Sequence, residues 1–211
     1  MAQQLYRIIL ITLLSTLCAC SATRLAGTWI NPEYQGKRFH KVLVMGVCQN
    51  ETYRRIFEDS MSRELMKRGI RAEPGYTLFP TAKKPDKAAI AGEISGQGFD
   101  ALIISQMTGK MTEEVVHPGY TYFLGAPLWY EPPLYDRDWF DYYSRSYDIV
   151  HEPAYVSSYQ VVTVQSNIYD TATNDLIWSA TSETVMDRDV NALIDSLVNT
   201  LIDGMKAKGL I

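Results

Sequence analysis

After the N-terminal forty residues, the first continuous run of apolar residues covers positions 42–47. Such a run is typical of a strand covered on both faces, and we place it at the centre of a predicted sheet. Asn50 follows as a candidate N-cap, and apolar side chains then recur at three- and four-residue spacing. This spacing predicts a helix that ends at Gly69.

The next segments continue the alternation of strands and helices. Residues 70–79 are extended in character, Pro85 opens a weaker helix, and residues 99–105 form another buried-looking strand. Gly92, Gly96 and Gly98 come at the end of this helix, whereas phosphate-binding glycine loops precede one. The order of these elements implies right-handed crossovers and an at least partly parallel sheet.

The C-terminal third predicts a β-hairpin followed by a helix. Residues 156–169 alternate between two faces, residues 170–175 have the composition of a turn, and residues 176–184 return as a second strand. Asp187 or Asp189 caps a last helix with a wide apolar stripe, read as core packing with an exposed oligomer seam as the alternative. We therefore predict one α/β domain over residues 41–211, with a βαβαβ unit, a β-hairpin and a C-terminal helix in a mixed sheet with helices packed on it.

A long aromatic insertion at about residues 117–152 interrupts this regular pattern. It is rich in tyrosine, tryptophan and proline, and a segment of this length inside a compact domain is usually functional or disordered. Three interpretations stay open: a loop covering a sheet face, a protein-binding segment, and a segment that contacts carbohydrate or lipid headgroups. The candidate partner-binding residues are Tyr120, Tyr122, Trp129, Tyr130, Tyr135, Trp139, Tyr142 and Tyr143.

Catalytic and metal-binding motifs are absent from the sequence. It contains no Walker loop, dinucleotide-binding glycine turn, Gly-x-Ser-x-Gly elbow or His-Glu-x-x-His. His117 and His151 flank the aromatic insertion near Glu113, Glu114 and Glu152, but their spacing is not a metal signature. The sequence therefore predicts no enzyme activity, no cofactor and no metal site.

The sequence predicts an export signal at the N-terminus. Arg7 precedes an apolar run at residues 8–14 that is too short to cross a bilayer as a helix. The run leads to Leu17-Cys18-Ala19-Cys20, which resembles the lipobox of bacterial lipoproteins. By that resemblance residues 1–19 are a signal peptide, and Cys20 carries a thioether-linked diacylglycerol and an N-acyl chain. We read residues 20–40 as the lipidated N-terminus and a tether, and we expect Trp29 and Phe39 of this tether to dock on the domain.

The charge and cysteine content fit an anchored exported protein. The formal net charge of −4 gives no basic surface for nucleic acid, so lipid provides the membrane attachment. Ser21 follows the lipidated residue, which by the same resemblance implies sorting to the inner leaflet of the outer membrane. Cys48 then has no partner for a disulfide, and is read as a small buried residue or as a reactive thiol.

The assembled pattern resembles a family of outer-membrane lipoproteins of Gram-negative bacteria without assigned activity. The matching stretches are residues 41–47, 55–59 and 169–180, the tyrosine-rich insertion and the terminal helix. The strand order and anchor are more distantly similar to the TolB N-terminal domain and to the periplasmic lipoproteins LpoB and CsgG, which act through protein contacts.

This resemblance implies a non-enzymatic lipoprotein on the periplasmic side of the outer membrane. Its expected role is that of an accessory or scaffold in envelope assembly or secretion, with an envelope protein as partner and a homo-oligomer left open. The alternatives are a glycan- or small-ligand-binding lipoprotein that uses the aromatic insertion, and a self-assembling structural component.

Overall fold

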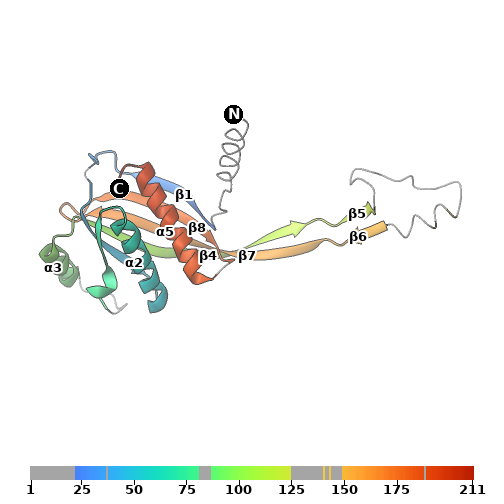
Figure 1. Cartoon of the computed structure of the whole chain (residues 1–211), viewed down its shortest axis with the longest axis horizontal. Coiled ribbons are helices and arrows are strands. Elements are labelled where there is room, and N and C mark those ends of the chain that lie inside the picture. The colour runs from blue at the N-terminus through green and yellow to red at the C-terminus, as the bar shows by residue number, and fades with distance from the viewer. Residues whose placement is uncertain are drawn as a thin grey trace, which may run out of the picture. The chain divides into compact units, whose positions relative to one another are not determined.

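A computed structural model describes residues 22–36, 38–80, 87–124, 140, 143, 149–187 and 189–211 (Figure 1). The chain divides into two compact units. The first comprises Met1–Met111 and Gln160–Ile211, and the second comprises Thr112–Tyr159. The second unit is therefore wider than the insertion expected from the sequence.

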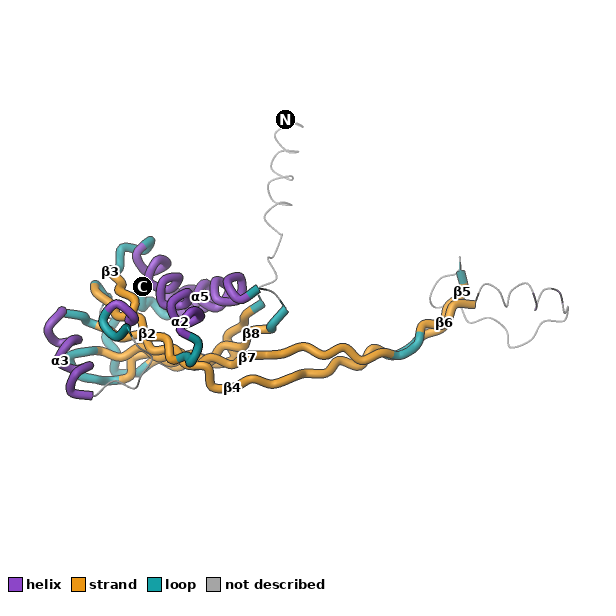
Figure 2. The backbone as a smooth tube through the Cα atoms, turned by 90° about the horizontal axis from the view of Figure 1, so that it is seen from below, coloured by secondary structure: helices purple, strands orange, loops and turns teal. Residues whose placement is uncertain are grey.

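The first unit is built on a six-stranded mixed sheet with the strand order β1-β8-β7-β4-β2-β3 (Figures 1 and 2). β2 pairs in parallel with both β3 and β4, whereas β8 pairs antiparallel with both β1 and β7. The strands are β1 (Thr23–Ile30), β2 (Lys41–Val47), β3 (Arg71–Pro74), β4 (Ala101–His117), β7 (Tyr155–Asp170) and β8 (Leu176–Val185). Residues 112–117 of β4 and 155–159 of β7 belong to the second unit.

Helices cover both faces of this sheet. α2 (Glu51–Met66) and α5 (Val190–Ala207) lie side by side on one face, as Figure 2 shows. Their core with the sheet includes the fully buried Trp178, Met61, Leu65, Leu201 and Ile202. α3 (Lys87–Gln97) contributes Ile94 to a smaller cluster with Leu43 and Phe99 on the other face, and a 3₁₀ turn, η1 (Gly75–Thr77), follows β3.

The predicted α/β fold class is confirmed, as are the hairpin and the terminal helix. Asn50 and Asp189 cap α2 and α5 by accepting hydrogen bonds from backbone amides of the first helical turn. The hairpin turn contains Asn174 at φ 64°, a conformation that asparagine tolerates better than most residues. One expectation is wrong: β2 is covered on both faces but lies beside the edge strand β3, and β7 and β4 occupy the centre.

The predicted tether at residues 20–40 is wrong over Thr23–Ile30, because this segment is the edge strand β1. A β-bulge between Leu25 and Gly27 changes which alternate side chains face α5. The alternation therefore breaks in mid-strand, which hides the strand from sequence analysis. Phe39 docks on the domain with 5 % exposure, whereas Trp29 is 46 % exposed.

A buried ion pair joins α2 to the sheet. Glu58 is fully buried, and one of its oxygens accepts hydrogen bonds from the Gly46 amide at 2.8 Å and from Arg54 Nε at 3.0 Å. Its other oxygen accepts from the Tyr76 amide at 2.7 Å, and Arg54 Nη2 donates to the Phe79 carbonyl at 2.8 Å. The pair thus connects helix α2, strand β2 and turn η1.

The second unit contains two further strands, β5 (Tyr120–Phe123) and β6 (Ile149–Glu152), which form a two-stranded antiparallel sheet. Part of the predicted aromatic insertion is therefore paired strand. The backbone at Gly119 lies close to the backbone of residues 152–154. A Cβ added at Gly119 would lie 2.6 Å from the Ala154 nitrogen and 2.7 Å from the Glu152 oxygen.

We expect Gly119→Ala to open this part of the ladder, because the added methyl group cannot fit against backbone atoms. The opening free energy of amides in β5 and β6 should fall by up to about 1 kcal/mol, which is much of what a two-stranded sheet has, measured by hydrogen-exchange mass spectrometry. Gly92→Ala in α3 is the control, since its added Cβ meets nothing within 4 Å. Unchanged exchange in β5 and β6 of Gly119→Ala would contradict the close approach.

Candidate interaction surfaces

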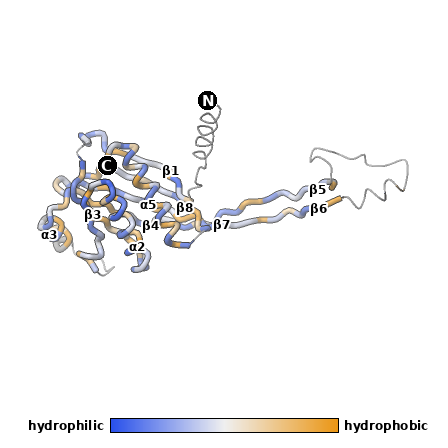
Figure 3. Tube along the Cα trace, in the orientation of Figure 1, coloured by the Kyte–Doolittle hydropathy of each residue, from blue (hydrophilic) through white to orange (hydrophobic). Residues whose placement is uncertain are grey.

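The second unit exposes large apolar side chains, most of them on its strands. Val116 on β4 is 68 % exposed, and Tyr155 on β7 is 60 % exposed. In Figure 3 apolar residues recur along the described strands of this unit. The other exposed apolar residues here are Val115, Tyr120, Leu124, Phe140, Tyr143, Ile149 and Val156.

Polar and aromatic contacts fix the two long strands of this unit against each other. The His117 ring stacks on the Tyr155 ring with centroids 4.3 Å apart, and His117 Nε2 lies 3.0 Å from the Ser157 hydroxyl. The Tyr159 hydroxyl donates to Glu113 at 2.6 Å. These contacts hold the ladder in register, so the exposed apolar residues lie on an ordered surface.

The histidines singled out by the sequence each have a hydroxyl partner. His151 Nδ1 lies 2.6 Å from the Thr121 hydroxyl, on the facing strand β5, and His117 contacts Ser157 on β7. Within the described ranges, no three His, Cys, Asp or Glu side chains are arranged to hold a metal ion. Cys48, which follows β2, is partly exposed.

Three of the eight candidate aromatic residues lie among the described residues. Tyr120 and Tyr122 lie on β5 with ring centroids 5.8 Å apart, and Tyr143 is 54 % exposed. The structure therefore places three of the eight candidates in the second unit. The remaining candidates, which lie outside the described residues, are Trp129, Tyr130, Tyr135, Trp139 and Tyr142.

The beginning of β1 brings the sheet close to the candidate lipidation site. The Ala22 carbonyl accepts a hydrogen bond from the Val185 amide at 2.9 Å, and the buried Thr23 hydroxyl lies 2.9 Å from that of Thr184. Ser21 alone separates Cys20 from Ala22 in the sequence. Sequence analysis missed this short connection because it read β1 as tether.

Helix α5 borders two open grooves of the first unit. The larger, about 630 Å³, runs along β1 and is lined by residues such as Leu25, Thr200 and Gly204. The second, about 290 Å³, lies between α2 and α5, where Ser60 donates to Asp195 at 3.1 Å. Beside it, hydrogen bonds from Lys67 and Arg68 lower the pKa of Glu64 on the surface of α2.

Comparisons with known proteins give fold-level likeness only. No family model and no curated protein matches the chain. Among solved structures, the PelC dodecamer from Paraburkholderia phytofirmans is 12% identical, with 85% of this chain and 94% of that chain covered and a TM-score of 0.45. Lipoprotein GNA1162 from Neisseria meningitidis is 13% identical, with 80% and 99% covered and a TM-score of 0.41.

None of the helices in the described ranges has both the length and the apolar character needed to span a bilayer.

Proposed function

We propose that this chain is a non-enzymatic lipoprotein, anchored through Cys20 on the periplasmic side of the outer membrane, that acts through protein contacts. Its role would be that of an accessory or scaffold in envelope assembly or secretion. The observation that carries this proposal is the exposed apolar surface on the ordered strands of the second unit, including Val116 and Tyr155.

The physics of small sheets supports a binding role for this surface. β5 and β6 pair only with each other in the described part of the chain, and an isolated two-stranded sheet is marginally stable in water. Exposed aromatic and aliphatic side chains on such strands gain stability when a partner covers them. Tyrosine is also enriched among the residues that dominate binding energies.

The N-terminal sequence supports the anchor. The apolar run at 8–14 and the lipobox-like residues 17–20 agree on Cys20 as the first residue of the mature protein. A negatively charged chain does not bind anionic lipid by charge, so covalent acyl chains would supply the attachment.

Site-specific photo-cross-linking in intact cells tests the binding surface. A photoreactive amino acid at Val116 or Tyr155 should give a discrete adduct with an envelope protein. The same residue at Met66 on α2, which is 54 % exposed, is the matched control and should give at least about tenfold less adduct.

Two results would contradict the proposal. Equal adduct yields from the second unit and from Met66 would show that the apolar surface is not a specific binding site. An adduct with the mass of two copies of this chain would instead support the self-assembling alternative.

A further inference from the structure

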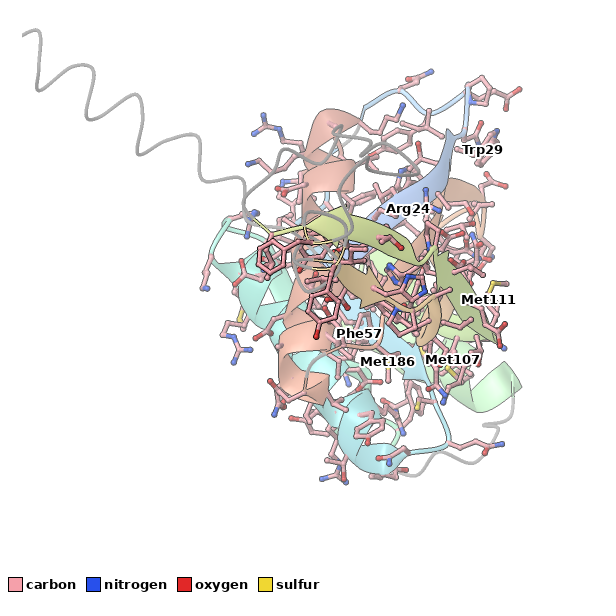
Figure 4. The ribbon with its side chains drawn as sticks, turned by 90° about the vertical axis from the view of Figure 1, so that its right-hand side faces the viewer. Arg24, Trp29, Phe57, Met107, Met111 and Met186 are labelled. Carbon is pink, nitrogen blue, oxygen red and sulfur yellow. The ribbon has the colours of Figure 1, made fainter. Side chains whose placement is uncertain are left out.

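A β-bulge in β1 turns Trp29 toward the sheet face opposite α5. Before the bulge, Thr23 pairs with Thr184 and Leu25 with Ser182, all on the side of α5. After the bulge, the even-numbered residues of β1 take that side, and Trp29 pairs with Ser179 on the other face. Figure 4 shows Trp29 on the side of the sheet away from α5. Without the extra residue, the alternation of the strand would place this ring against the helix.

The floor beside Trp29 is a network of uncharged polar side chains on β7 and β8. Gln165 Nε2 donates to the Ser179 hydroxyl at 2.6 Å, and that hydroxyl donates to Asn167 at 2.9 Å. The Thr181 hydroxyl donates to Gln165 Oε1 at 2.7 Å. Each amide and hydroxyl keeps further donor or acceptor capacity beyond these bonds, so the network fixes the orientation of groups that can still bind a ligand.

The edges of this face leave room beside the tryptophan. Gly27 pairs with Thr181 in the next exposed row of β1, and a Cβ added at Gly27 would meet nothing within 4 Å. One row further, Arg24 and Glu183 form a salt bridge at 2.6 Å and neutralise each other. The surface from Arg24 to Trp29 is about 15 Å long at the rise of a β-strand.

We propose that this face binds an uncharged glycan. The Trp29 ring would stack against the C–H face of a sugar, because the negative face of an aromatic ring attracts the slightly positive hydrogens. The amides and hydroxyls of Gln165, Asn167, Ser179 and Thr181 would exchange hydrogen bonds with sugar hydroxyls. The length of the surface matches an oligosaccharide segment better than a single ring.

The charges and polarity of the face favour this ligand over two others. A charged polymer would need an unpaired charge on the floor, whereas Arg24 and Glu183 bind each other. A protein partner would gain most from an apolar centre, whereas the residues around Trp29 are polar. The site lies in the first unit and does not depend on the aromatic surface of the second, so the two proposals can fail separately.

Titration of the full-length protein with chitohexaose and with maltohexaose tests the site. The protein is kept in a zwitterionic detergent, because a glycosidic detergent would itself present sugar. Calorimetry should show saturable binding of at least one oligosaccharide. Trp29→Ala should weaken it about tenfold, and Trp29→Tyr, which keeps a ring, by less than about threefold.

Controls separate loss of the site from loss of the fold. Tyr53→Ala removes another exposed ring, from α2, and should leave binding unchanged. Gln165→Leu keeps the side-chain size and should weaken binding while thermal unfolding stays close to that of the wild type. Three outcomes would overturn the proposal. The first is no saturation by either oligosaccharide up to about 10 mM. The others are binding of acidic polygalacturonate alone and unchanged binding by the Trp29→Ala variant.

Discussion

Replacing Glu58 with alanine should lower the free energy of unfolding of the first unit by about 3–5 kcal/mol. The substitution removes the acceptor for the Gly46 and Tyr76 amides and the carboxylate that is hydrogen-bonded to Arg54, whose side chain is 6% exposed and, among the described carboxylates, keeps only Glu51 at 3.7 Å. Removing one partner of a buried ion pair destabilises a protein far more than removing one partner of a surface pair, because water cannot replace the lost partner.

Urea unfolding followed by circular dichroism measures this effect, with the midpoint lowered and the slope unchanged. Glu64→Ala is the matched control on the same helix, since Glu64 pairs with Lys67 and Arg68 near the surface. Glu64→Ala should lower the free energy of unfolding by no more than about 1 kcal/mol. Similar losses for the two variants would mean that the buried pair does not hold α2 to β2.

Cys20→Ser should abolish lipid attachment and remove the protein from the outer-membrane fraction. The proposed thioether requires the Cys20 sulfur, and a serine hydroxyl does not replace it. Metabolic labelling with an alkyne-tagged palmitate should therefore fall to background in this variant, while the total amount of chain stays measurable by immunoblot.

Cys48→Ser provides the internal comparison, because Cys48 is the cysteine that follows the proposed signal and anchor. This variant should label and fractionate like the wild type. Palmitate incorporation that persists in Cys20→Ser, or that disappears in Cys48→Ser, would show that the anchor has been assigned to the wrong residue.

Local patterns predicted most of the first unit. The N-cap Asn50, the N-cap of the last helix at Asp187 or Asp189, the helical spacing that follows these caps and the turn at Asn174 each depend on neighbours in the chain. The structure confirms these features, with Asp189 as the cap. Local information does not determine which strands lie next to each other. The position of β2 beside the edge of the sheet was therefore predicted wrongly.

β1 shows why an irregular strand escapes sequence analysis. A strand is recognised by strict alternation, and one extra residue between Leu25 and Gly27 changes the phase of the pattern halfway along. The uncharged floor beside Trp29 was missed for the same reason, since Ser179 and Trp29 become neighbours only when β1 is paired with β8.

Glu58 shows a second limit. On a helix, a carboxylate next to a second acidic residue, here Asp59, has the sequence pattern of a solvent-exposed pair. The structure shows Glu58 fully buried, where it accepts hydrogen bonds from the Gly46 amide of β2 and the Tyr76 amide of η1. Sequence cannot show that backbone amides from a strand and from a separate turn converge on one side chain.

The hydrogen bond between Ala22 and Val185 has a consequence for affinity if Cys20 carries the anchor. Two residues span at most about 7 Å, so the first unit would be held at the leaflet surface instead of sampling the volume that a twenty-residue tether allows. Confinement to so thin a layer raises the effective concentration of the domain toward other components of the same leaflet. Contacts too weak to survive in free solution would then be sufficient at the membrane.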